Sequence, residues 1–506
     1  MLRLIDNRLN AITMYRLVLY YLIFLAGVAT ALSVWHVLAF DPATLVVSTL
    51  FLLAVCWIAN GIFARTFRVP ANVESVYISA LILALIIDPA RSTHDLWFLT
   101  WAAVWSMASK YIVAIRGKHL FNPVAFAVAL TALTINQTAS WWVGSAPMLP
   151  FVAVGAVLIV RKTRRFSMVI SFLTVSLLAS LLLSLVNGGN VLGVLQQIVL
   201  LSPWLFFAAV ILTEPLTTPP TRNLQIIYGA IVGLLFSPQV HLGPFYATPE
   251  LSILVGNVFS YLVSPKTKLV LRLKEKIQLA PDIYDFIFTP NRKLSFAPGQ
   301  YMEWTLGHDQ PDSRGNRRYF TLASSPTEPE LRIGVKFYPH SSSYKRSMLA
   351  MDEDSEIVAA QLAGDFTLPE DPRQRLVFIA GGIGITPFRS MIQYLLDTRQ
   401  KRPITLIYAN RTVSEIVYRD VFERARRELG IKTIYTLTDV ERVPSGWQGV
   451  IGRVTGPFIM SQVPYYRDCL YYLSGPNAMV TAFEQTLLAL RIRRDHIKTD
   501  FFPGLV

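Results

Sequence analysis

The hydrophobic and polar positions of the chain follow two different patterns, and the change from one to the other falls near Pro265. Before this point the apolar residues form long runs, and a helix needs only about 20 such residues to cross a hydrocarbon core of ~30 Å. The runs lie at residues 17–35, 43–62, 72–87, 96–109, 123–136, 148–160, 166–187, 191–213, 224–237 and 251–263. They predict a polytopic all-α membrane domain over residues 1–265, with about ten spans.

After Pro265 the apolar runs become short. The first of them are rich in β-branched and aromatic residues and are separated by turns, in the order KLVLRLKEKIQL, IYDFIFTP, GQYMEWTL, RYFTLASS, LRIGVKFY and SEIVAAQL. This spacing predicts an antiparallel β-barrel over residues 266–372. Strands then alternate with helices, as in LVFIA, TPFRSMIQYLLD and ITLIYAN. That pattern predicts a parallel α/β sheet of the dinucleotide-binding kind over residues 373–506.

Composition supports a membrane half joined to a soluble half. The residues up to Pro265 carry 21 charged side chains and the remaining 241 residues carry 59, so the first half has too few charges for a soluble surface. The net charge of +14 is shared equally between the halves, so no basic arm indicates a nucleic-acid partner. Cys56 and Cys469 are the two cysteines, which excludes an iron–sulfur cluster held by this chain alone. No metal site is expected.

The distribution of Lys and Arg between the apolar runs predicts an orientation. If alternate loops lie on opposite sides, twelve cationic residues fall on one side and only Arg91 on the other. Cationic loops stay cytoplasmic. Both termini are therefore expected in the cytoplasm, and the chain in a lipid bilayer that is a bacterial inner (plasma) membrane. None of the seven histidines lies within a run, so a transmembrane haem is not expected.

Two apolar runs end in the same way. LALIIDP ends with Asp88 before a proline, and AAVILTEP ends with Glu214 before a proline. With five spans between them, the two carboxylates fall on opposite sides of the membrane, as an inverted repeat requires. The alternative is that an acidic residue before proline only ends a helix.

The segment RLVFIAGGIGITPFRSM predicts a strand, a glycine turn and a helix. Gly381, Gly382 and Gly384 let the backbone approach a pyrophosphate closely, while Thr386 and Pro387 suit the N-cap and the first position of a helix. Free amides and the helix dipole then face an anionic ligand. A tight strand-to-helix turn also uses glycine for geometry alone, and this alternative stays open for the segment taken by itself.

The segment RYFTLASSP places Arg318, Phe320 and Thr321 on one predicted strand. Arginine suits a phosphate, an aromatic ring can stack on a planar cofactor, and a hydroxyl can bond a ring nitrogen. Arg318 and Phe320 stand at alternate positions and share a face of the strand. An ordinary half-buried strand is the alternative. Further along, Ser342 and Ser343 open a predicted helix and offer a second seat for an anion.

A third segment, YYLSGPNAM, ends a strand in Ser474, Gly475 and Pro476. In this order the segments resemble the ferredoxin–NADP reductase superfamily across residues 268–506. The resemblance implies FAD at the RYFT strand and at the serine helix start, with NADH or NADPH at the two glycine turns. It also implies that the reaction takes place beside Thr321 and Ser474, the serine replacing the family's usual cysteine.

The membrane half resembles a second family. SKYIVAIRGKHLFNPVAF and LTEPLTTPPTRNLQIIYGAIVGLL are similar to segments of the D subunit of Rnf and the B subunit of the sodium-translocating NADH:quinone oxidoreductase. The resemblance covers about residues 10–264 and implies two inverted repeats. That family attaches FMN to a threonine upstream of the acidic-Pro step, where this sequence has Trp204. A second flavin is therefore expected to be non-covalent, with candidate lining from the loops after Asp88 and Glu214 and the Gly117–Pro123 turn.

These observations predict a membrane-bound NAD(P)H-dependent flavin oxidoreductase. Hydride from cytoplasmic NAD(P)H is expected to reach FAD, and electrons then pass to a membrane or extracytoplasmic acceptor, either a quinone or a flavin relay. Two alternatives remain. The membrane half could be a transporter coupled to the redox state of the soluble half, or it could dock a reductase that serves a soluble redox partner protein.

Overall fold

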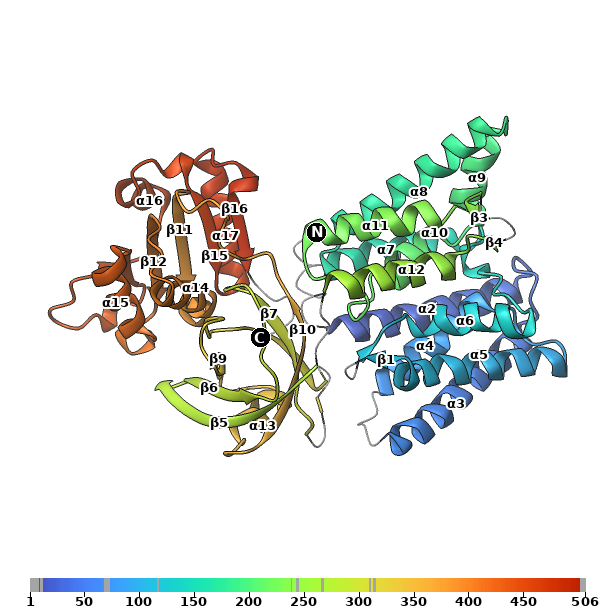
Figure 1. Ribbon diagram of the computed structural model, residues 1–506, viewed down its shortest axis with the longest axis horizontal. Helices are drawn as coiled ribbons and strands as arrows, with labels where there is room; N and C mark the ends of the chain where they lie inside the picture. The colour runs from blue at the N-terminus through green and yellow to red at the C-terminus, as the bar shows by residue number, and fades with distance from the viewer. Residues whose placement is uncertain are drawn as a thin grey trace. The chain divides into compact units, whose positions relative to one another are not determined.

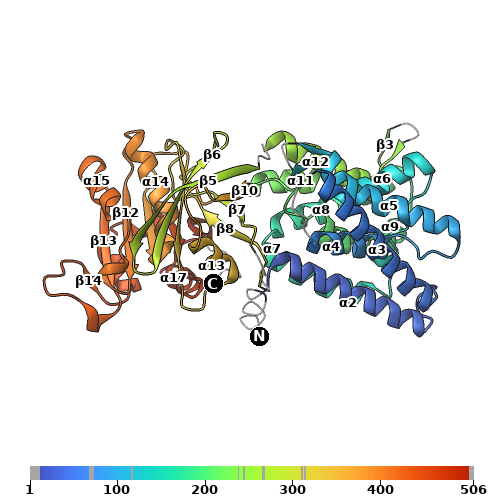
Figure 2. The same cartoon turned by 90° about the horizontal axis from the view of Figure 1, so that it is seen from below.

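The computed structural model describes residues 9, 12–67, 73–115, 118–237, 239–242, 245–264, 268–308, 311–312 and 315–500. The chain forms two compact units, Met1–Thr267 and Lys268–Val506, hereafter the N-terminal unit and the C-terminal unit (Figure 1, Figure 2). The division between the units falls where the hydrophobic pattern changes along the sequence.

The N-terminal unit is built of helices, and each apolar run of the sequence contains a helix or, in one case, a bent pair of helices. Side-chain caps set several of the helix starts. Asp41 accepts a hydrogen bond from a backbone N–H in the first turn of α3, and Asn122 accepts two such bonds at the start of α6. The helices are α2 (Met14–Val34), α3 (Pro42–Thr66), α4 (Val73–Ile86), α5 (Thr93–Ile112), α6 (Pro123–Ile135), α7 (Leu149–Thr163), α8 (Phe166–Val186), α9 (Val191–Leu201), α10 (Trp204–Phe206), the π-helix η2 (Phe207–Ile211), α11 (Arg222–Leu235) and α12 (Pro249–Val263).

The helices α2, α3 and α8 are long and apolar enough to span a membrane, and the bent pair formed by α9 and α10–η2 gives a fourth span if it counts as one. The prediction of ten spans is therefore wrong for the residues that the structure describes. Helices α4, α6, α7, α11 and α12 have 13 to 15 residues, which reach only about 20–22 Å at 1.5 Å per residue. These helices are about as long as the apolar runs that predict them, so the runs themselves are too short for spans, which need about 20 residues.

The N-terminal unit uses one order of elements twice. Helices α2 to α5 are followed by a β-hairpin and α6, and the same order recurs in α7, α8, the bent pair, α11, a second β-hairpin and α12. Asp88 follows the third element of the first set, and Glu214 follows the third element of the second set. This order supports a repeat, and its inversion across a membrane stays a prediction. The two antiparallel hairpins are β1 (Ala114–Ile115) with β2 (Lys118–His119), and β3 (His241–Leu242) with β4 (Phe245–Tyr246).

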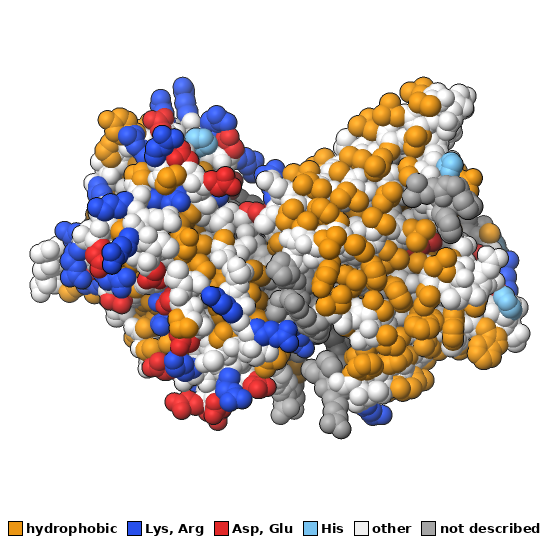
Figure 3. Space-filling model, in the orientation of Figure 1, with side chains coloured by type: hydrophobic (Ala, Val, Ile, Leu, Met, Phe, Trp, Pro, Cys, Tyr) orange, Lys and Arg blue, Asp and Glu red, His pale blue; other side chains and the backbone are white. Residues whose placement is uncertain are grey.

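Large apolar side chains are exposed on the outside of the N-terminal unit. Phe24 on α2, Leu50 on α3 and Leu182 on α8 are 52%, 59% and 59% exposed. Figure 3 shows a broad apolar surface over this unit, whereas Lys, Arg, Asp and Glu side chains are spread over the C-terminal unit. Soluble proteins rarely expose apolar patches of that extent. The surface of the N-terminal unit is therefore compatible with association with a membrane.

The C-terminal unit begins with an antiparallel sheet in the order β8-β7-β10-β5-β6-β9. Inward side chains such as Phe286, Trp304 and Ile357 form its buried core. The sequence predicts a barrel, but among the described residues the strand pairing of this sheet is open between its two edge strands, β8 and β9. A backbone hydrogen bond from Ala323 N to Arg332 O crosses this opening. All six predicted strands are present, as β5 (Leu269–Ala280), β6 (Ile283–Pro290), β7 (Tyr301–Thr305), β8 (Arg317–Thr321), β9 (Leu331–Lys336) and β10 (Glu356–Ala363).

The second sheet of the C-terminal unit is parallel, as predicted, in the order β14-β13-β12-β11-β15-β16. Side chains of β11 alternate between its two faces: Phe378 packs in the core shared with α14 and α15, and Ile379 in the core shared with α16 and α17. The strands are β11 (Leu376–Gly381), β12 (Ile404–Asn410), β13 (Lys432–Leu437), β14 (Val450–Ile451), β15 (Leu470–Ser474) and β16 (Ile497–Asp500). The helices are α14 (Thr386–Asp397), α15 (Arg419–Leu429), α16 (Gly456–Gln462) and α17 (Asn477–Ala489).

Candidate functional site

The glycine turn follows the carboxyl end of β11. Gly381 ends the strand, a 3-10 helix, η3, occupies Gly382–Ile385, and α14 begins at Thr386. Thr386 is therefore the first residue of the helix, and the prediction that it is the N-cap is wrong. Its Oγ1 donates to the carbonyl of Ile383 at 3.3 Å. The glycines already coil the backbone before the helix begins, so no side-chain cap is needed, and Pro387 lies in the first turn.

The two glycine turns predicted from separate segments meet. A Cβ atom added to Gly384 would lie 2.5 Å from both the backbone N of Gly475 and the carbonyl O of Ser474. Any side chain at Gly384 would therefore push the turn at Pro476 away from the end of β11. This close approach exists because β11 and β15 are neighbouring parallel strands whose carboxyl ends lie at the same edge of the sheet.

Arg318 and Phe320 share one face of β8, as their alternation predicts. The guanidinium carbon of Arg318 lies 4.9 Å from the ring centroid of Tyr344, and the ring of Phe320 lies 6.2 Å from the same ring. Arg318 is 4% exposed, and its Nη1 donates to the carbonyls of Gly315 and Arg317. Because β8 is an edge strand among the described residues, its outer backbone groups are available to a planar ligand. The strand therefore fits a flavin.

Thr321 and Ser474 meet at a carboxylate that the sequence analysis missed. Thr321 Oγ1 donates to Oδ2 of Asp500 at 3.2 Å, and the Ser474 side chain also hydrogen-bonds to Asp500. Ser474 and Asp500 are directly paired in the register of β15 and β16. Burial raises the pKa of Asp500 to about 7, although the two hydroxyl groups lower it. The signal in the sequence was a lone carboxylate at the end of the short strand IKTD.

The predicted anion seat at Ser342 and Ser343 is a helix start, as expected, and it already holds a carboxylate. Ser342 is the N-cap of α13 (Ser343–Leu349), and its Oγ accepts a hydrogen bond from the N of Lys345. The backbone N of Ser343 donates to Oδ2 of Asp312 at 2.9 Å, and Ser343 Oγ accepts from Asp312 N at 2.9 Å. Asp312 also pairs with Arg318, since its Oδ1 lies 3.8 Å from Arg318 Nη2, so a phosphate bound by these serines or by Arg318 has to displace Asp312.

A second polar cluster lies in the N-terminal unit, after the π-helix η2. The carboxylate of Glu214 accepts hydrogen bonds from Asn122 Nδ2 at 2.9 Å and Thr217 Oγ1 at 3.1 Å, and His119 Nε2 lies 3.3 Å from it. The structure therefore brings Glu214 to the predicted turn before Pro123, although Gly117 of that turn lies outside the described residues.

Asp88 does not join this cluster. Its Oδ1 accepts a hydrogen bond from Ser140 Oγ at 2.6 Å. Trp204, at the position where the related family has its threonine, donates from Nε1 to Ser176 Oγ at 2.8 Å. Of the predicted lining, the structure thus brings together Glu214 and the Asn122 turn, and it leaves Asp88 apart from them.

Comparison with known proteins finds relatives of the C-terminal unit among oxidoreductases. Residues 378–485 match the family model described as "Oxidoreductase NAD-binding domain". A flavohemoprotein of Burkholderia sp. (strain TH2) is 28% identical over 231 residues, covering 45% of this chain and 57% of that protein. The F subunit of the Na(+)-translocating NADH-quinone reductase of Methylococcus capsulatus is 34% identical over 146 residues, covering 28% of this chain and 35% of that protein. The crystal structure of an Amycolatopsis cytochrome P450 reductase aligns with a TM-score of 0.42 and 24% identity, over 47% of this chain and 70% of that chain.

The chain spans less than two thirds of the length of either relative. The matches and the geometry together identify the C-terminal unit as a ferredoxin–NADP reductase-like module that binds FAD and a nicotinamide nucleotide. The predicted cofactors, FAD and NADH or NADPH, and the prediction of an NAD(P)H-dependent flavin oxidoreductase are confirmed for this module. The resemblance of the N-terminal unit to the Rnf D family stays a prediction.

Proposed function

We propose that the chain is a membrane-bound oxidoreductase that takes hydride from cytoplasmic NAD(P)H onto FAD and passes the electrons to a membrane or extracytoplasmic acceptor. The observation that carries this proposal is the meeting of three distant segments at one place. Gly384 touches the backbone of Ser474 and Gly475, and Thr321 is hydrogen-bonded to Asp500. Groups suited to a flavin and groups suited to a nicotinamide therefore lie side by side.

Each residue of this site has a distinct part in the proposal. A bound FAD supplies the chemistry, because it accepts two electrons as hydride and can release them one at a time. Arg318 binds a phosphate of the cofactor, and Phe320 stacks on its ring. The glycine turn at Gly384 lets the pyrophosphate of NAD(P)H approach the start of α14. Asp500, with a pKa of about 7, holds or releases a proton next to Thr321.

In the N-terminal unit, we assign electron transfer across or into the membrane to the Glu214 cluster. The pair α9 and α10–η2 is bent by 57°, and broken helices at membrane depth line binding sites in transport proteins. π-Helical turns such as η2 are also frequent at functional sites. The proposal places a quinone or a second, non-covalent flavin beside Glu214 and Asn122. Both termini are cytoplasmic in this proposal, with the C-terminal unit on the NAD(P)H side.

The flavin content of the purified full-length chain tests both the FAD site of the C-terminal unit and the second redox site proposed in the N-terminal unit. NADH or NADPH should bleach the flavin absorbance, and acid precipitation should release all the flavin, at close to two equivalents per chain, with no Soret band of haem. Two released equivalents support a relay in the N-terminal unit. Release of only one equivalent of flavin, with quinone reduction intact, contradicts a second flavin. The remaining alternative is then that quinone is reduced at the cytoplasmic face of the membrane. A flavin-free chain that is well folded contradicts the proposal as a whole.

A further inference from the structure

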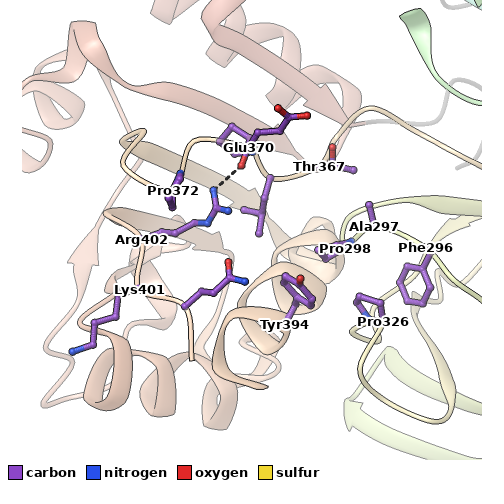
Figure 4. Close-up of a pocket in the computed structure, with 13 residues that line it drawn as sticks. Phe296, Ala297, Pro298, Pro326, Thr367, Glu370, Pro372, Tyr394, Lys401 and Arg402 are labelled. Atoms are coloured by element: carbon purple, nitrogen blue, oxygen red, sulfur yellow. Dashed lines mark hydrogen bonds between the residues drawn. The ribbon is translucent and has the colours of Figure 1, made fainter. Parts of the chain in front are cut away.

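A cavity of about 730 Å³ lies in the C-terminal unit between its two sheets (Figure 4). Its walls come from the loop before β7, the turn after β8, the linker between the sheets, the last turns of α14 and the residues before β12. In the same order, these segments contribute Phe296, Pro326, Pro369, Tyr394 and Arg402. We call it the hinge cavity. Its volume is within the range of roughly 300–1,000 Å³ that small-molecule sites occupy.

The hinge cavity is distinct from the FAD and nicotinamide site. Arg402 precedes β12 and so lies at the amino end of the parallel sheet, whereas Gly381 and Ser474 lie at the carboxyl ends of β11 and β15. The two ends of a strand as long as β11 are about 20 Å apart. None of the predicted site residues, all of which the structure describes, lines the cavity. An occupant would therefore leave room for both cofactors.

Flat apolar groups and cationic groups line the hinge cavity together. Phe296 and Tyr394 present their rings, as Figure 4 shows. Arg402 holds the linker with one edge of its guanidinium, because Nη1 donates to the carbonyl of Pro369 at 2.7 Å. Its Nε is buried beyond the reach of a ligand, whereas Nη2 is not buried and makes no hydrogen bond among the described residues. Lys401 is exposed and forms no ion pair within that part of the chain.

This combination indicates the class of ligand. Nη2 of Arg402 is a charged donor that the described residues leave without a partner, and the planar guanidinium matches a carboxylate or a phosphate. Glu370 is an exposed carboxylate in the lining, and Asp371 beside Arg402 is already paired with Arg373, so Lys401 and Arg402 outweigh Glu370. We propose that the hinge cavity binds a small ring-bearing oxyanion, whose ring lies against Phe296 and Tyr394 and whose anionic group lies at Arg402.

Binding in the hinge cavity is coupled to the reaction site through two segments. The turn at Pro326 follows β8, the strand of Phe320 and Thr321, and Tyr394 belongs to α14, the helix that starts at the glycine turn. The turn and the helix are joined firmly, since Arg389 Nη2 donates to Glu328 Oε1 at 2.9 Å and Ser390 Oγ donates to Ser324 O at 2.6 Å.

An occupant that contacts both segments bears on the hydrogen bonds that join the turn after the flavin strand to the helix after the nicotinamide turn, and the coupling we propose is a change in nicotinamide affinity. This coupling rests on the proposed function, whereas the binding itself does not.

Calorimetric titration of the full-length, FAD-loaded protein tests the binding. The probes are 1-naphthoate, 1-naphthyl phosphate and the neutral 1-naphthamide. We expect either anion to bind, and the amide to bind at least about tenfold more weakly, because it lacks a charge for the guanidinium. Arg402→Gln and Lys401→Gln should each weaken anion binding, Arg402→Gln by about tenfold. Arg426→Gln is the matched control, since its 69% exposed side chain pairs with Glu423 outside the cavity, and it should bind like the wild type.

Several results would overturn the inference: no heat of binding with either anion, equal affinity for the amide, or unchanged affinity in both Arg402→Gln and Lys401→Gln. Retained flavin absorbance in each variant shows that the module is folded. The coupling is measured in the same samples, where saturating 1-naphthoate should change the KM for NADH at least about twofold. An unchanged KM overturns the coupling. If the anions bind but NADH does not reduce the flavin, the proposed function is contradicted and the inferred ligand site in the hinge cavity is supported.

Discussion

Thr321 Oγ1 donates a hydrogen bond of 3.2 Å to Oδ2 of Asp500, across 179 residues of sequence. The bond joins an edge strand of the antiparallel sheet, β8, to an edge strand of the parallel sheet, β16. Because Asp500 is 8% exposed, its carboxyl is held away from water by both sheets. Its protonation state therefore affects the stability of the fold as well as the reaction site.

Asp500→Asn should change the pH dependence of stability. Burial raises the pKa of Asp500 to about 7, against about 3.9 in an unfolded chain. The folded state holds the proton more tightly, so this carboxyl stabilises the fold fully below pH ~4 and loses that contribution as pH rises to ~7. Above pH ~7 the buried charge costs up to about 4 kcal/mol, which the asparagine avoids. Urea unfolding at about pH 4.5 and pH 8 measures this difference.

Asp495→Asn is the control for that measurement. Asp495 lies on the exposed turn before β16, and its hydrogen bond to Arg493 lowers its pKa, so it titrates below the window in which Asp500 does. Its replacement should leave the slope of stability against pH unchanged between about pH 4.5 and pH 8. If Asp500→Asn has the same slope as the wild type, the carboxyl is solvated and its assigned place in the site is wrong.

Gly384→Ala should separate nicotinamide binding from flavin binding. The added Cβ would meet the backbone of Ser474 and Gly475 at 2.5 Å, and overpacking against backbone typically costs about 1–3 kcal/mol. We expect the KM for NADH to rise by about tenfold or more at unchanged FAD content. Gly307→Ala is the control, because nothing lies within 4 Å of its added Cβ. Equal kinetics of the two variants would contradict the contact between the turns.

Arg318→Ala should release FAD while the module stays folded. A hydrogen bond between charged groups contributes about 1.5–3 kcal/mol, so FAD affinity should fall by about tenfold to a hundredfold. The flavin retained per chain after gel filtration measures the loss. Arg317→Ala is the matched control on the same strand, since Arg317 pairs with Glu303 instead. If Arg318→Ala keeps its flavin, Arg318 does not bind the phosphate of FAD, and the phosphate site lies elsewhere.

Glu214→Gln should affect electron delivery and spare the C-terminal unit. The carboxylate receives hydrogen bonds from Asn122 and Thr217, and an amide in its place cannot accept them all. Reduction of a soluble artificial acceptor by NADH should stay within about twofold, while quinone reduction falls by about tenfold or more. Asp88→Asn, whose carboxylate is bonded to Ser140 instead, should change neither rate. Quinone reduction at the wild-type rate in Glu214→Gln would place the acceptor site away from this cluster.

Local patterns predicted the C-terminal unit well because they are set by local physics. Alternation put Arg318 and Phe320 on one face, and β-rich runs marked all six strands of the first sheet. Asp500 escaped because a single carboxylate at the end of a strand has no periodicity, and only the pairing of β15 with β16 brings it to Thr321. The carboxylate of Asp312 was also not predicted, because no local pattern marks it and only the fold brings it to the start of α13.

The number of spans was overestimated because several of the counted apolar runs are too short to cross a bilayer. The run at 251–263 becomes α12, which has 15 residues, so the run and the helix agree and both fall short of the about 20 residues that a span needs. The sequence also contained the sign of the broken helix, since Pro203 lies inside the run that becomes α9 and α10. An apolar run with an internal proline is better interpreted as two short helices than as one span.

The strand order of the parallel sheet has a consequence for how the protein is made. β11 carries the glycine turn, yet one of its two neighbours, β15, comes almost at the end of the described chain, and β16 pairs only with β15. Contacts between residues so distant in sequence form late, because closing a long loop costs entropy before any contact offsets it. The reaction site closes only when Asp500 of β16 reaches Thr321, so firm retention of the flavin depends on the slowest-forming edge of the molecule. In refolding experiments, uptake of FAD should lag behind the recovery of helical circular dichroism, with FAD acting as the last part of the structure to be added.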